Sequence, residues 1–130
     1  MRRLLPTLLA ASVLVACGGE EPEDVEQVIR GWAKAANERD AEAWCNDYVT
    51  QEFAEQVSGA TGDNAREQCE KLFDVTQPRF RITIVDVSRI EIDGSEATAL
   101  VRRRTTGSGT SNQVFRLEQE DGEFRIDSEG

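Results

Sequence analysis

Few residues in this chain could carry out chemistry, because its 130 residues include no histidine. A Ser/His/Asp triad and a Cys/His pair are excluded, and the most common general base is absent. The candidates for catalysis are therefore carboxylates and the single tyrosine, namely Asp86 and Tyr48, followed by Asp47 and Asp127. A carboxylate in an apolar setting can abstract a proton, and Asp86 lies within the apolar run 82–87.

The spacing of Val85 and Val87 favours a different interpretation of Asp86. Alternation along a strand places Asp86 opposite these two valines, at a bulge or in solvent. Tyr48 is typical of a partly buried helix residue whose hydroxyl stays in water. The sequence therefore assigns no catalytic residue and favours a protein that is not an enzyme.

Arg103 is the polar candidate for ligand binding. On a strand it shares one face with Ala97, Ala99 and Val101, whereas its two neighbouring arginines point the other way. If that face lines a cavity, Arg103 could hold a ligand carboxylate in a bidentate pair. The alternative is a cross-strand ion pair with an acid such as Glu91, Glu118 or Glu120.

Trp32 and Trp44 are the aromatic candidates for ligand binding. Each offers a large apolar surface with one N–H donor, which suits a binding wall. The same properties suit ordinary core packing or the rim of a cavity, so the sequence leaves both interpretations open.

The amino terminus has the pattern of a bacterial export signal. Arg2 and Arg3 precede an apolar stretch at 4–16 that ends in small residues. This stretch of about 13 residues is shorter than the roughly 20 that a membrane-spanning helix needs. The sequence Leu-Val-Ala-Cys-Gly at 14–18 resembles the lipobox of bacterial lipoproteins. The resemblance implies cleavage before Cys17 and lipidation of that cysteine; the alternative is an ordinary secretory signal cut after Ala16.

These features predict a signal peptide at 1–16, a lipidated tether at 17–23 and one domain at 24–130, held at the extracytoplasmic face of a cell membrane. Diacylglyceryl modification and palmitate would anchor the chain stably, because two or more acyl chains are needed for this. Cleavage removes two of the 15 basic residues and none of the 25 acidic ones, which leaves a formal charge of −12. Such a surface repels nucleic acid and anionic headgroups.

Cys45 and Cys69 remain once Cys17 is assigned to lipid. In an oxidising compartment two cysteines favour a disulfide, and the alternative is a pair of buried free thiols. A zinc site is disfavoured, because two thiolates without histidine do not complete a tetrahedral set. We expect no metal and no cofactor.

The first half of the chain is predicted to be helical. Apolar residues recur at helical spacing between Pro22 and Glu38. Asp40 is a predicted N-cap for a second, short helix, Thr50 for a third, and Asn64 for a fourth that carries Cys69.

The second half shows the period-two pattern of strands. A long strand from about residue 80 changes parity at 85–87, which predicts either a bent strand with a bulge or a strand buried partly on both faces. Further strands follow at 97–104, 114–119 and 124–128. Asp93-Gly94 and Asp121-Gly122 are predicted hairpin turns. The prediction is an α+β fold with N-terminal helices packed on a curved, mostly antiparallel four-stranded sheet.

This order of elements resembles the NTF2-like superfamily, the cystatin-like cone that includes SnoaL-like and ketosteroid-isomerase-like proteins. The resemblance rests on the Ile-Arg-Gly-Trp-Ala sequence at 29–33, the Asn-Glu-Arg-Asp-Ala junction at 37–41, and the long strand with its hairpins, and it covers about 22–128. It implies a sheet wrapped around helices, with an open end that can hold a ligand. It also allows a homodimer through the exposed sheet face.

The superfamily contains isomerases, dehydratases, carriers and protein-binding domains, so fold alone does not select a function. The sequence favours a membrane-tethered envelope lipoprotein that binds a protein partner or a small ligand without catalysis. The alternative is a small isomerase- or dehydratase-like enzyme, in which Asp86 and Tyr48 would converge inside the cone.

Overall fold

The computed structural model describes residues 21–76 and 81–130. The predicted signal peptide, Cys17 and most of the tether lie outside these residues. Within them, none of the helices combines the length and the apolar character that crossing a membrane requires.

Four helices form the first half of the described chain, as predicted: α1 (Pro22–Glu38), α2 (Ala41–Asp47), α3 (Gln51–Ser58) and α4 (Asn64–Thr76). Asp40 and Thr50 cap α2 and α3, accepting hydrogen bonds from the backbone N–H groups of Ala43 and Phe53, each at 3.1 Å. Arg39 ends α1 in the left-handed conformation, with φ of 57°. The predicted caps at Asp40 and Thr50 are therefore confirmed, whereas Asn64 is the first residue of α4 itself and not its cap.

Four strands follow in the order β1-β2-β3-β4, each antiparallel to the next: β1 (Ile82–Asp93), β2 (Glu96–Thr105), β3 (Gly109–Glu120) and β4 (Glu123–Glu129). The register of β1 on β2 shifts between Ile84 and Asp86, which confirms the predicted bulge. A second shift follows between Ser88 and Glu91, where Arg89 has a φ of 49°. These two irregularities bend β1.

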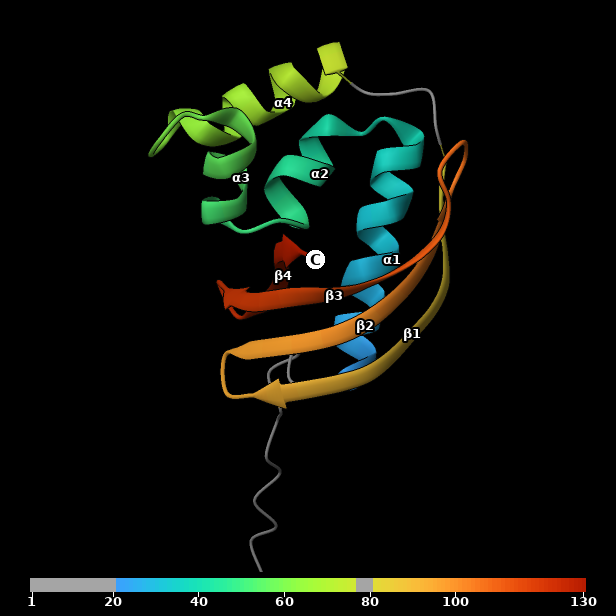
Figure 1. Cartoon of the computed structure of the whole chain (residues 1–130). Coiled ribbons are helices and arrows are strands. Elements are labelled where there is room, and N and C mark those ends of the chain that lie inside the picture. Colours follow the sequence, from blue (N-terminus) through green and yellow to red (C-terminus); the bar gives the residue numbers. More distant parts are fainter. Residues whose placement is uncertain (1–20, 77–80) are drawn as a thin grey trace, which may run out of the picture.

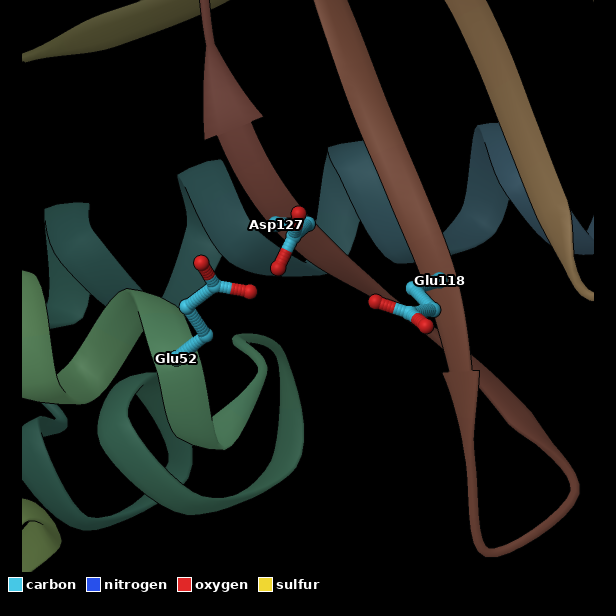
Figure 2. Close-up of side chains that lie close together, drawn as sticks. All are labelled: Glu52, Glu118 and Asp127. Carbon is cyan, nitrogen blue, oxygen red and sulfur yellow. The ribbon is translucent and has the colours of Figure 1, made fainter.

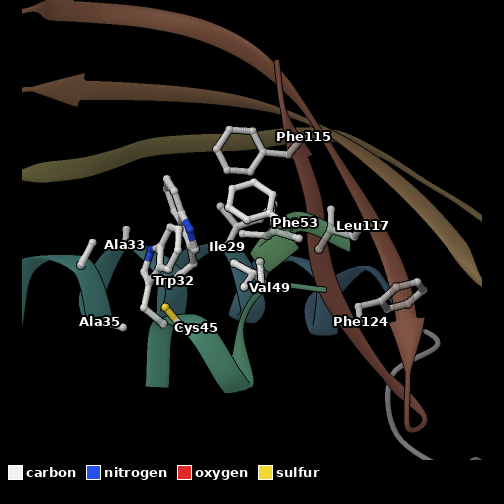
Figure 3. Packing of buried hydrophobic residues seen from close by; sticks show 14 of the residues in the cluster. Ile29, Trp32, Ala33, Ala35, Cys45, Val49, Phe53, Phe115, Leu117 and Phe124 are labelled. Carbon is white, nitrogen blue, oxygen red and sulfur yellow. The ribbon is translucent and has the colours of Figure 1, made fainter. Parts of the chain in front are cut away.

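The sheet curves around α1, and α2, α3 and α4 lie together at one end of the molecule (Figure 1). Its concave face supplies Phe115, Leu117 and Phe124, which are at most 2% exposed, to a core shared with Ile29 and Trp32 of α1 (Figure 3). The α+β fold with helices on one face of a curved antiparallel sheet is therefore confirmed.

A disulfide and the hydrogen bonds of one arginine hold the helical end of the molecule together. The predicted disulfide between Cys45 and Cys69 is confirmed: it joins α2 to α4, with Cα atoms 6.0 Å apart. Arg66 of α4 donates hydrogen bonds to the carbonyl oxygen of Cys45 at 2.6 Å and to Glu120 Oε1 at 2.9 Å. The end of β3 is thereby tied to the same helices that the disulfide joins.

Candidate functional site

A cavity of about 510 Å³ lies between the helices and the hairpin that joins β2 to β3. Its walls are mostly apolar and come from α1, α2, α3, α4 and the start of β1: Trp32, Ala36, Trp44, Val57, Leu72, Phe73 and Ile82. Apolar walls and a volume of several hundred cubic ångströms are typical of small-molecule sites.

Polar residues are concentrated on the sheet side of this cavity: Arg103, Thr105, Ser108, Ser111 and Glu129. Arg103 follows the buried residues Ala99 and Val101 on the inner face of β2, so its side chain points into the cone as the alternation predicted. Its guanidinium carbon lies 5.9 Å from the ring centroid of Trp32, within the range of a cation–π contact. The alternation therefore identified the arginine of the pocket correctly.

Glu129 is the acid that faces Arg103, with 3.6 Å between Arg103 Nη1 and Glu129 Oε2. The expected cross-strand partners Glu91, Glu118 and Glu120 do not fill this role. Burial raises the pKa of the Glu129 carboxyl above its ordinary value, and the Arg103 guanidinium partly opposes that rise. Among the described residues that line the cavity, Arg103 and Glu129 are the charged ones.

Two hydrogen-bond donors at this end of the cavity have no acceptor in the described part of the protein. They are the indole Nε1–H of Trp32, a residue that is 2% exposed, and the Nε–H of Arg103. A buried donor without a partner costs about 1–3 kcal/mol, and native proteins contain few of them. Arg125 Nε–H also lacks an acceptor among the described residues and does not line the cavity, so what distinguishes the Arg103 donor is its place on a residue of the cavity wall.

Both tryptophan candidates line the cavity and also pack in the core. Trp32 meets Phe115 edge to face, with ring centroids 5.4 Å apart, and Trp44 lies 5.3 Å from Phe73. The two interpretations of these residues are therefore compatible, because the inner side of the core is the wall of the cavity.

The structure does not bring the candidate catalytic residues together. Asp86 is exposed and pairs in register with Arg102 of β2, whereas Tyr48 is half-buried beside Gly31 of α1. A Cβ atom on Gly31 would come within 2.7 Å of Tyr48 Cζ, so this glycine makes room for the tyrosine ring. Neither Asp86 nor Tyr48 lines the cavity, and an enzyme that uses an acid inside the cone would have to use Glu129 instead.

Asp127, another of the candidate acids, belongs to a different cluster. Its carboxylate lies with those of Glu52 and Glu118, their oxygens within 4.8 Å of one another (Figure 2). Thr50 Oγ1 donates a hydrogen bond of 2.8 Å to Asp127 Oδ1, while Glu52 and Glu118 are exposed. Carboxylate oxygens are the ligands that Ca²⁺ and Mg²⁺ prefer, but exposed acids often gather without an ion. We assign no ion to this cluster.

Sequence reasoning missed Glu129 and the acidic cluster. The three acids of the cluster come from α3, β3 and β4, so no short motif contains them. Asp47, the remaining candidate, is exposed at the end of α2 and does not line the cavity.

Comparisons with known proteins identify the fold. No protein-family model matches the chain, and no curated protein matches it significantly. Among solved structures, the chain is similar to a Xanthomonas campestris protein described as a calcium/calmodulin dependent protein kinase II association domain. The two share 17% identity over 84% of each chain, with a TM-score of 0.50. At this identity the likeness shows the fold alone, and that α+β fold agrees with the cone that the sequence resemblance implied.

Proposed function

We propose that this protein is a membrane-tethered envelope lipoprotein whose cone binds a small, largely apolar ligand without catalysis. The observation that carries the proposal is the cavity of about 510 Å³, with apolar walls and two unpartnered donors at its polar end. The lipobox-like sequence at 14–18 supports the tether. The positions of Asp86 and Tyr48, both outside the cavity, favour binding over catalysis.

The test is native mass spectrometry of the protein isolated from its own cell envelope in mild detergent. We expect the mass of a small molecule in addition to that of the lipid. Ser111 faces Arg103 across β2 and β3 and lines the cavity, so Ser111→Phe should fill the site and abolish the extra mass. Asn112→Phe adds the same side chain at the next position, which points away from the cavity, and should retain the ligand.

A wild-type protein without any small molecule would contradict ligand binding. Full-chain Cys17→Ser tests the tether separately, since it should lose the lipid mass and leave the membrane fraction. Retention of Cys17→Ser in the membrane would contradict lipid anchoring but would leave the pocket untouched.

Self-association is a second candidate function. The Xanthomonas campestris protein is described as an association domain. On the outer face of this sheet, Leu100 pairs in register with Val114, which is 48% exposed, and together they form an apolar patch. Sedimentation equilibrium at increasing concentration would detect a homodimer, and Val114→Lys should weaken it. A strictly monomeric wild-type chain would exclude this function.

A further inference from the structure

The polar end of the cavity is arranged around a loose ion pair. The 3.6 Å between Arg103 Nη1 and Glu129 Oε2 exceeds the roughly 2.7–2.9 Å of a charge-assisted hydrogen bond. The Nε–H of the same guanidinium and the indole N–H of Trp32 have no acceptor among the described residues. Glu129 therefore lies close to the guanidinium of Arg103 but leaves some of the N–H donors of that guanidinium unused.

We propose that the cavity takes a ligand with an apolar body and a carboxylate group, and that this carboxylate replaces that of Glu129 on Arg103. The inference rests on the proposed function and names the chemical class of its ligand. The Arg103 side chain is 16% exposed and lines the cavity, so the two oxygens of a ligand carboxylate can accept from its guanidinium in a bidentate pair. The aromatic and aliphatic walls take the apolar body.

Trp32 keeps the guanidinium in place during the exchange. The ring lies beneath Arg103 and is itself fixed by Phe115 and Trp44, at centroid distances of 5.4 and 6.3 Å. The two nitrogens are shielded from solvent in the ligand-free form. A ligand carboxylate therefore reaches the Nε–H only when Glu129 gives up its place beside the guanidinium.

Exchange of one carboxylate for another requires a proton. A ligand carboxylate beside an ionised Glu129 would place two negative charges on one guanidinium, and these charges repel each other although Glu129 remains partly hydrated. Arg103 is the charged group that faces Glu129, while β3 contributes Phe115 opposite it and α1 contributes Trp32. The ligand anion and one proton therefore bind together: the anion pairs with Arg103, and the proton goes to the Glu129 carboxylate.

Binding should consequently weaken as the pH rises. Burial already raises the pKa of Glu129, so protonation of this group is accessible. Above that pKa, uptake of one proton makes the apparent dissociation constant rise by up to about tenfold per pH unit.

A pair of matched probes tests the ligand class, using the full chain with Cys17→Ser and its disulfide formed. The probes are 2-naphthoate and the neutral 2-naphthalenemethanol, which share the same ring system, and binding is followed by calorimetry over a range of pH. At acidic pH we expect naphthoate to bind at least about tenfold more tightly than naphthalenemethanol, a difference of about 1.4 kcal/mol in binding free energy. The affinity of naphthalenemethanol should not depend on pH.

Two variants separate the roles of the paired residues. Glu129→Gln keeps the size of the side chain but removes the competing anion, so it should tighten naphthoate binding at neutral pH by about tenfold and abolish its pH dependence. Arg103→Gln should lose naphthoate binding and retain naphthalenemethanol. Thermal unfolding of each variant establishes that it is folded.

Equal affinity for the two probes would overturn the inference, as would weaker naphthoate binding in Glu129→Gln. Failure of a folded wild-type chain to bind either probe would also overturn it. The proposed function fails on a different result, namely the absence of any small molecule from the protein isolated from its own envelope.

Discussion

Arg66 and Arg103 are two partly buried arginines with similar exposure and very different surroundings. Their side chains are 20% and 16% exposed, respectively. The guanidinium of Arg66 donates to five acceptors: the carbonyl oxygens of Cys45, Asn46 and Val49, Gln51 Oε1 and Glu120 Oε1. Arg103 has one ion-pair partner at 3.6 Å and an Nε–H without an acceptor.

The difference separates a structural arginine from a binding one. The last carbonyl groups of a helix lack partners within the helix, and Arg66 supplies donors to those at the end of α2. Its bonding is complete without any other molecule. Arg103 lies on a cavity with unused donors, so its bonding can be completed by a ligand. Burial alone would not distinguish the two.

The largest effect should come from the disulfide beside Arg66. Replacement of both Cys45 and Cys69 by alanine removes a cross-link with a sequence separation of 24 residues. The free energy of unfolding should fall by about 3.5 kcal/mol in the chain-entropy model. Urea unfolding of the double variant and of the wild type measures the difference. A loss of less than about 1 kcal/mol would show that this end of the molecule does not depend on the cross-link.

Arg66→Met should have the next largest effect. It leaves the helix-end carbonyls without their donor and removes a cation from Glu120, so the free energy of unfolding should fall by about 3 kcal/mol. Arg103→Met is the matched control, because it removes the other arginine of similar exposure.

The control should cost less than about 1 kcal/mol, since it breaks one loose ion pair whose acid remains partly hydrated. Urea unfolding of both variants decides the comparison. Equal losses would mean that both arginines are structural and that Arg103 is not set apart by its place on the cavity.

Local sequence patterns predicted most of the fold and half of the polar site. The caps at Asp40 and Thr50, the bulge of β1 and the inward direction of Arg103 each depend on neighbours within a few residues. Such signals are readable because helix caps and strand alternation are local properties of the backbone.

Glu129 was not predictable by the same reasoning. Phe124 and Ile126 point into the core, so simple alternation would direct Glu129 outward. The register of β3 on β4 shifts between Arg116 and Leu117, which leaves Asp127 without a partner in the ladder and restores Glu129 to the inner face opposite Phe115. The bulge has no local signature in the sequence, because it depends on how two strands meet.

Glu129→Gln should change the pH dependence of stability. In the folded chain, the pKa of Glu129 is raised above the ordinary value of 4.5 that it has when unfolded. The folded state therefore holds this proton more strongly, and its contribution is fully present below about pH 4.5 and is lost as the pH rises through the folded pKa. Glu129→Gln has no such loss, so its stability relative to wild type should increase with pH.

Urea unfolding of both chains across the acidic to neutral range measures this difference, in which the titration of the other acids largely cancels. A difference that shrinks as the pH rises would contradict the direction of the shift. It would also remove one support for proton uptake in the cavity.

The smallest effect should come from the acidic cluster, whose members carry the opposite charge to Arg66 and include two exposed glutamates. Glu118 lies with Glu52 and Asp127 and stands directly opposite Glu96 in the register of β2 and β3. On its other side it stands opposite Arg125 of β4, whose guanidinium pairs with Glu120. Like charges opposite each other destabilise a sheet, so Glu118→Gln should raise the free energy of unfolding by about 0.5 kcal/mol at low ionic strength. Because these acids are exposed, the gain should vanish in about 1 M salt, where the screening length is about 3 Å. A loss of stability in Glu118→Gln that persists in salt would mean that its carboxylate makes a stabilising contact, as Glu120 does with Arg66.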